Sequence, residues 1–238
     1  MKRKALIIGN SGNSDEYLEG VEKDINNYKN FLKSPIGGAW YNDEIVISLD
    51  ETKEDILQKI SKIREEMNDF VFILFSGHGS YSLNRECRKL YIYDDSIYEN
   101  NLLYLASKQI TIMDTCAGVE DDLLKESAMM DSIIALEHDK DNTVYRILYE
   151  SEIENSPRQQ VILYSSSIDE SSGDDSELGG YFAYNLLKVA RRNIENILDT
   201  RKAYLYAKKI VQNKTNNEQN PQCKCSRSNN ILPFSIKG

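Results

Sequence analysis

The sequence predicts an α/β protein with a mostly parallel six-stranded sheet and helices on both faces. Apolar runs alternate along the chain with segments of helical spacing, and repeated strand–helix units of this kind form parallel sheets covered by helices. The run at residues 69–75 (DFVFILF) is nearly all apolar, as expected for a strand buried on both faces. With 238 residues, 40% of them hydrophobic and 28% charged, we expect a single globular domain over residues 1–238.

Five apolar runs predict the main strands, and a sixth predicts a strand at the sheet edge. The main runs are 5–9, 44–49, 69–75, 109–113 and 161–164. The sixth run, 231–236, contains Pro233, which lacks an N–H donor and therefore favours an edge position. A further short strand is expected on the surface at 89–93.

Helices are predicted where apolar residues recur every three or four positions. The predicted helices are 18–32, 52–67, 181–189 and 203–211, with a helical piece around 123–136. Two stretches interrupt the alternation. Residues 119–160 are rich in charge, and residues 167–180 are rich in Ser, Asp and Gly, which predicts a loop.

Charge and composition exclude several classes of function. The net charge of −9 disfavours nucleic-acid binding, which usually needs a basic face. No apolar stretch approaches the length of a membrane span, and the one after Lys4 is too short for a secretory signal. The four cysteines form no disulfide framework, and the lone C-x-C of Cys223 and Cys225 lacks two further zinc ligands. We therefore expect a cytoplasmic protein with no metal, no nucleic acid and no membrane partner.

A histidine and a cysteine follow two successive main strands. His78 lies in Ser76–Gly79 (SGHG) and Cys116 in Asp114–Gly118 (DTCAG). Functional sites of parallel sheets form beyond the carboxyl ends of the strands, and neighbouring strands lie about 4.8 Å apart. If these strands are neighbours, the imidazole favours the thiolate, which attacks a carbonyl carbon, and the imidazolium protonates the leaving amine.

The surrounding glycines support this catalytic interpretation. Gly77 and Gly79 allow a tight turn and a close approach of substrate, and the N–H groups of Gly79 and Cys116 are candidates for an oxyanion hole. Taken alone, a histidine after a strand is usually a loop residue, and a cysteine there is usually buried and inert. Their joint placement favours catalysis.

These blocks resemble the two signature motifs of metacaspases and bacterial caspase-like peptidases, with the cysteine after the histidine. The opening strand with residues 18–24 (LEGVEKD) is similar to the start of that family, and residues 179–183 (GGYFA) to its late helix. The resemblance covers nearly the whole chain, although Val21 and Lys23 replace the Cys and Asn that are frequent in the family. It implies a caspase-like fold and a cysteine endopeptidase, with a place in cell-death or defence systems.

The resemblance also implies a pocket for a basic side chain. Asp24, Ser76 and Asp114 match the positions that line this pocket in metacaspases, whereas true caspases have Gln-Ala-Cys at 114–116. Two carboxylates in a partly buried pocket repel each other, so the pocket binds one cation favourably and excludes an acidic side chain. The expected partner is therefore a protein or peptide substrate with an exposed Arg or Lys.

Residues 119–160 fall where family members have a processing linker. Arg158, beside Pro157, is the first candidate for self-cleavage, with Arg146 and Lys140 as alternatives, and an uncut surface loop remains the other outcome. Carboxylates also cluster, at 120–122 and at Asp169, Glu170, Asp174, Asp175 and Glu177. Some metacaspases need calcium, but neither run has the spacing of a known calcium loop, so we expect no essential cofactor.

Three other functions compete with the peptidase. A catalytically silent scaffold of the same fold is disfavoured because such relatives usually lose the His or the Cys, and both are present. The sequence signal for nucleotide binding at Gly9–Gly12 is weak, because the loop lacks the Lys-Ser/Thr pair of a phosphate-binding loop. A different cysteine hydrolase, such as an amidase, would use the same two residues.

Overall fold

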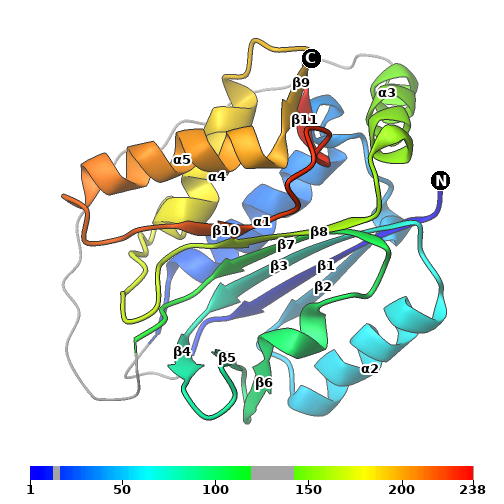
Figure 1. Cartoon of the computed structure of the whole chain (residues 1–238). Helices are drawn as coiled ribbons and strands as arrows, with labels where there is room; N and C mark the ends of the chain where they lie inside the picture. Colours follow the sequence, from blue (N-terminus) through cyan, green and yellow to red (C-terminus); the bar gives the residue numbers. More distant parts are fainter. Residues whose placement is uncertain (13–16, 119–141, 238) are drawn as a thin grey trace.

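The computed structural model describes residues 1–12, 17–118 and 142–237. Its central sheet has six strands in the order β10 (Gln222–Lys224), β8 (Gln159–Tyr164), β7 (Lys108–Asp114), β3 (Phe70–Gly77), β1 (Arg3–Asn10) and β2 (Ile45–Leu49). Every neighbouring pair is parallel except β10 with β8. The predicted six-stranded, mostly parallel sheet is confirmed, and its five main strands are the five predicted ones (Figure 1).

The sixth strand of the sheet comes from a different segment than expected. The edge is β10, whose three residues include Cys223. The predicted edge strand does form, as β11 (Pro233–Ile236), but it pairs with β9 (Ile197–Asp199) in a separate two-stranded sheet. Its Phe234 is fully buried and stacks on Phe31 with ring centroids 5.3 Å apart, so β11 covers the helical layer instead of extending the sheet.

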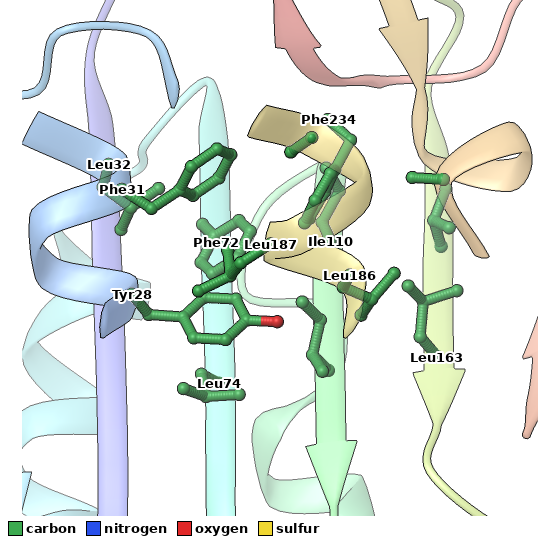
Figure 2. Packing of buried hydrophobic residues seen from close by; sticks show 14 of the residues in the cluster. Tyr28, Phe31, Leu32, Phe72, Leu74, Ile110, Leu163, Leu186, Leu187 and Phe234 are labelled. Atoms are coloured by element: carbon green, nitrogen blue, oxygen red, sulfur yellow. The ribbon is translucent and has the colours of Figure 1, made fainter. Parts of the chain in front are cut away.

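Helices cover both faces of the sheet, as predicted. The helices are α1 (Gly20–Lys33), α2 (Lys53–Glu65), α3 (Asn142–Asn155), α4 (Tyr181–Arg191) and α5 (Thr200–Lys214). One apolar cluster joins α1, α3, α4 and α5 to one face, and Figure 2 shows Tyr28 and Phe31 of α1 and Leu186 of α4 lying over the strands. The other face packs against α2 and the small sheet. Alternate residues of β1 enter the two clusters, which explains its continuous apolar run.

Helix α3 occupies the second half of the predicted linker 119–160. Only Tyr149 and Ile153 of this helix are buried, while Val144, Ile147 and Leu148 are exposed, so its apolar pattern is a poor guide to its packed face. The helical piece predicted around 123–136 lies outside the described residues.

A small antiparallel sheet follows β3 directly. It consists of β4 (Gly79–Ser82), β5 (Cys87–Tyr91) and β6 (Ser96–Tyr98). Strand β5 overlaps the one expected at 89–93, but three of its five residues are buried, so it is not a surface strand. Three short 3-10 helices, η1 (Pro35–Gly37), η2 (Asn42–Glu44) and η3 (Glu99–Leu102), complete the connections. Among the described residues, no helix combines the length and apolar character needed to span a membrane.

Candidate active site

The register of β3 and β7 brings the two sequence motifs together. Ser76 pairs with Asp114 at the carboxyl ends of these neighbouring parallel strands. His78 and Cys116 each follow two residues beyond that paired position. The structure therefore places both residues at one edge of the sheet, as the alternation of strands and helices predicts.

A sharp turn after β3 carries His78. Gly77 has φ +155°, and a Cβ there would lie 2.8 Å from the backbone oxygen of Asn10, so a larger residue would strain the turn. On the other side, the backbone N–H of Tyr91 donates to the His78 carbonyl over 3.0 Å. The histidine is thus positioned between β1 and the small sheet.

Residues 115–118, which follow β7 and carry the candidate nucleophile Cys116, form the nucleophile loop. Backbone and hydroxyl contacts hold this loop in place. Thr115 donates its N–H to Ser165 Oγ, and Ser165 Oγ donates to the Thr115 carbonyl, both over 3.0 Å. The Ala117 N–H donates to the Glu170 carbonyl over 2.9 Å, and the Asp169 N–H to the Ala117 carbonyl over 2.8 Å. These contacts fix the backbone on both sides of Cys116.

The thiol of Cys116 contacts the backbone of Ser172, in the loop between β8 and α4. The Ser172 N–H donates to Sγ over 3.3 Å, and Sγ lies 3.7 Å from the Ser172 carbonyl oxygen, within reach as a donor. Cys116 is only partly buried. The loop that ends at α4 therefore forms a wall directly against the sulfur.

Gly79, the other residue assigned to the oxyanion hole, lies against the nucleophile loop. A Cβ at this position would approach Thr115 Oγ1 to 2.3 Å and the Lys89 carbonyl oxygen to 2.8 Å. The backbone of Gly79 therefore lies against Thr115, the residue that precedes Cys116, and leaves no room for a side chain. Its role in an oxyanion hole stays a prediction.

Two buried carboxylates lie beside the nucleophile loop. Asp24 of α1 accepts from Ser76 Oγ over 2.6 Å and from the Gly180 N–H over 3.2 Å. Asp114 accepts from Ser172 Oγ over 2.8 Å and from the Ala183 N–H over 2.7 Å. The structure therefore brings Asp24, Ser76 and Asp114 together, and the hydrogen-bond donors to the two carboxylates described here are all neutral.

Burial raises the pKa of both carboxyl groups. Desolvation raises the pKa of Asp24 well above its usual range, and the charge of Asp114 raises it further. The pKa of Asp114 rises to about 6, mainly because of burial, while the Ala183 and Ser172 hydrogen bonds oppose the shift. Two acidic groups buried side by side are poorly solvated as anions, so a basic group entering between them would be favoured.

A small cavity of about 20 Å³ joins these groups, enough for about one water molecule. It is lined by Leu18, Val21, Ser76, Gly77, Asp114, Thr115, Cys116, Ser172, Gly173, Asp174 and Gly180. Asp24 is not among the lining residues and lies behind Ser76 and Gly180. The candidate nucleophile and a buried carboxylate thus share one cavity.

Three lining residues, Ser172, Asp174 and Gly180, were missed as site residues from the sequence. They belong to the 167–180 loop and to the start of α4, where only the similarity of GGYFA to the family motif pointed to the site. Gly180 lies so close to Asp114 that a Cβ on this glycine would be 2.4 Å from Asp114 Oδ2. Only the closure of the loop onto β7 brings these residues to the nucleophile.

Two of the candidate self-cleavage residues, Arg158 and Arg146, lie away from the cavity. Arg158 is exposed just before β8, at the amino end of a strand whose six residues span about 20 Å, whereas Cys116 lies beyond the carboxyl ends. Arg146 pairs with Glu44 through its two terminal nitrogens, over 2.8 and 2.6 Å. Lys140 lies outside the described residues.

The carboxylates of the 167–180 loop point to separate partners. Glu170 accepts from the N–H groups of Ser167 and Asn220, and Asp175 accepts from those of Glu177 and Leu178. Within the described part of the chain, no group of three or more His, Cys, Asp or Glu side chains is arranged to hold a metal ion.

Comparisons with known proteins agree with this geometry. Metacaspase-1 of Eremothecium gossypii is 38% identical over 88 residues, which cover 32% of this chain and only 19% of that protein. Caspase-1 from Spodoptera frugiperda has a similar fold, with a TM-score of 0.68 at 16% identity, covering 99% of this chain and 92% of that one. A protein from Geobacter sulfurreducens matches with a TM-score of 0.62 at 13% identity, covering 99% of both chains.

A family model described as "Caspase domain" matches residues 2–232, which is nearly the whole chain. The match includes both strand ends that carry His78 and Cys116 and the loop that closes over them. This protein belongs to the caspase-domain family.

Proposed function

We propose that this protein is a cysteine endopeptidase that cleaves proteins and peptides after Arg or Lys. The observation that carries the proposal is the shared cavity, in which Cys116 lies next to the buried carboxylate of Asp114, with Asp24 directly behind. The caspase-domain match supports peptidase chemistry, and the acidic cavity supports a basic substrate.

In this mechanism Cys116 is the nucleophile and His78 is the acid–base partner. His78 takes the thiol proton, the thiolate attacks the scissile carbonyl carbon, and the backbone N–H groups of Gly79 and Cys116 stabilise the oxyanion. The imidazolium then protonates the leaving amine, and water hydrolyses the acyl-enzyme. The Ser165 contacts to Thr115 keep the nucleophile loop rigid through these steps.

The cavity of about 20 Å³ is too small for an arginine side chain, so substrate binding requires an opening. Ser172 is the residue to move, since it contacts both Cys116 and Asp114. A guanidinium would replace the neutral donors on the carboxylate with charge-assisted, paired hydrogen bonds, which are stronger. For the same reason we expect Arg to be preferred over Lys.

Matched fluorogenic peptides that end in Arg, Lys, Asp or Leu before the reporter test this function. Wild type should cleave the Arg and Lys peptides, and Cys116→Ala or His78→Ala should lose on the order of 10³-fold or more in rate. Cys223→Ser, which changes a thiol on the edge strand β10, serves as the control and should retain activity.

The same experiment separates the peptidase from the catalytically silent scaffold. A scaffold would cleave none of the peptides and would give identical results for wild type and Cys116→Ala. Preferred cleavage after Asp or Leu would retain the peptidase but contradict the basic pocket. We also propose a cytoplasmic location, because the four cysteines form no disulfide framework. A role in cell death or defence rests on the resemblance alone and would be tested by loss of the gene under phage challenge.

A further inference from the structure

We infer that Asp174 is a specificity-determining residue, the carboxylate that faces the incoming basic side chain together with Asp114. The inference rests on the proposed function and extends it, because Asp174 was not among the pocket residues that the sequence motifs indicate. It assigns the direct contact to a residue of the loop before α4, and leaves Asp24 to act from behind.

The first support is the lining of the cavity. Asp114 and Asp174 both line it, whereas Asp24 does not. Asp24 is 1% exposed, and Ser76 and Gly180 cover its oxygens with hydrogen bonds of 2.6 and 3.2 Å. A substrate side chain that entered the cavity would reach Asp114 and Asp174 without displacing either of these residues.

The second support is the way the structure orients Asp174. Its Oδ2 accepts from the N–H of Gly20, the first residue of α1, over 3.1 Å. A Cβ on Gly20 would lie 2.0 Å from Asp174 Oδ1, so this carboxylate rests against the glycine. The amino end of a helix favours an anion, and α1 therefore holds a charged group at the wall of the cavity.

The third support is electrostatic. The charge of Asp174 raises the pKa of Asp24 and of Asp114, so its field extends into the site. Unlike those two side chains, Asp174 is only partly buried. It therefore carries negative charge at the cavity wall, where a cation first meets the pocket.

Asp174 also has a purely structural interpretation, as a cap of α1 supplied by a distant part of the chain. The substitution Asp174→Asn separates the two roles, because asparagine is also a good capping residue but carries no charge. Asp174→Ser is a second, smaller capping variant in case the amide disturbs the fold. The matched control is Glu177→Gln, which removes one charge from an exposed position of the same loop.

The experiment measures protection of Cys116 from iodoacetamide, read by mass spectrometry of the peptide that contains it, so it needs no turnover. The probes are n-butylguanidine and its neutral analogue n-butylurea. We expect n-butylguanidine to protect wild type and Glu177→Gln with Kd values within about twofold of each other. In Asp174→Asn and Asp174→Ser its Kd should rise about tenfold, equivalent to about 1.4 kcal/mol, and n-butylurea should protect none of them.

A peptide assay complements the protection assay. The ratio of kcat/KM for peptides ending in Arg and in its neutral analogue citrulline should fall about tenfold in Asp174→Asn and stay constant in Glu177→Gln. Unchanged protection and an unchanged ratio in Asp174→Asn would overturn the inference and leave Asp174 as a helix cap only. Absence of protection in wild type would also overturn it. Protection that depends on Asp174, in a protein that cleaves no peptide, would support the inference while the peptidase proposal fails.

Discussion

At the scale of single residues, the site buries two carboxyl groups side by side, which is unfavourable for stability when no ligand is bound. Asp24 and Asp114 are buried as a pair, with hydrogen bonds from neutral donors only among those described. Buried acidic pairs reduce stability at neutral pH and persist where a bound cation uses them. On this ground we propose that the pair serves to bind a basic group.

The pKa of Asp114 predicts a pH dependence of substrate preference. Because this pKa rises from 3.8 to about 6, the carboxyl becomes protonated as the pH falls through 6, and its attraction for a cation is then lost. The ratio of kcat/KM for Arg and citrulline peptides should fall between pH 7.5 and pH 5. The ratio cancels the pH dependence that the two peptides share, and it should change less with pH in Asp114→Asn than in wild type.

The raised pKa of Asp114 also determines whether this carboxyl adds to or reduces the stability of the fold as the pH changes. The folded protein binds the proton of Asp114 more tightly than the unfolded chain, so the contribution of this carboxyl to stability is greatest at low pH and is lost as pH rises through about 6. Addition of n-butylguanidine should therefore raise the Tm more at pH 7.5 than at pH 5. An equal shift at both values would contradict the assignment.

At the scale of elements, the turn between β3 and β4 is the most constrained part of the site. Gly77→Ala should lower the free energy of unfolding by about 1–3 kcal/mol, because it adds a Cβ at positive φ against Asn10, and it should reduce activity by displacing His78. Denaturant titration measures the loss. The control is Gly118→Ala, where a Cβ meets nothing within 4 Å among the described residues, and where stability should change by less than about 0.5 kcal/mol.

The carboxylate-rich loop before α4 gives a prediction about calcium. Glu170 and Asp175 accept hydrogen bonds from backbone N–H groups, which a bound ion would have to break. Peptidase activity should therefore be the same in excess EDTA and in millimolar calcium. An absolute calcium requirement would show that an ion site is built elsewhere or on loading.

Strands and helices with a complete apolar pattern could be predicted from the sequence, and the remainder could not. The runs of β1, β3 and β7 are buried on both faces, so composition alone identifies them. The edge strand β10 has three residues, Gln-Cys-Lys, with no apolar signal. Helix α3 exposes much of its apolar surface, so its sequence pattern does not indicate its packed face.

The candidate site divides in the same way. His78, Cys116 and Asp114 follow strand ends within short motifs, so their meeting could be predicted from the order of the strands. Asp174 reaches the cavity only because the long loop after β8 folds back onto β7 and α1. Its separation of 154 residues from Gly20 in the chain carries no local signal, and such a contact depends on tertiary packing.

At the scale of the whole molecule, the two parts of the chain on either side of residues 119–141 share one core. Strands β7 and β8 pair along their length, Arg146 pairs with Glu44, and Tyr28 Oη donates to the Ala183 carbonyl over 3.1 Å. These contacts cross the division through the sheet, the surface and the helical layer. We therefore expect the fold to survive a break in the chain at 119–141.

A chain cut between the two parts should remain one particle. With a site-specific protease sequence inserted within residues 119–141, the two fragments should co-elute in size-exclusion chromatography after cleavage and separate only in denaturant. Independent elution of the fragments in native buffer would contradict this. Intact mass after long incubation of the unmodified enzyme then tests whether self-cleavage occurs, at Arg158 or elsewhere.

The Ser172 hydroxyl predicts a more reactive variant. Ser172→Ala keeps the backbone N–H against Cys116 but removes the hydrogen bond to Asp114, so the loop should leave the cavity more readily. We expect faster alkylation of Cys116 by iodoacetamide and a lower KM for Arg peptides. The control is Ser171→Ala, an exposed neighbour in the same loop. A slower alkylation rate would show that the hydroxyl holds the thiol in its reactive state.

Ser172 contacts both Cys116 and Asp114, so a substrate must displace this residue before it can bind. In the proposed mechanism the loop has a closed and an open population, and the apparent affinity of any substrate is then its intrinsic affinity multiplied by the open fraction. Only a ligand that binds the open form better can shift that balance, and in this cavity a cation has the carboxylates to do so. Peptides without a basic side chain would find the loop mostly closed, so they would rarely reach the thiol of Cys116. Discrimination would then arise before the chemical step, in the equilibrium of the loop.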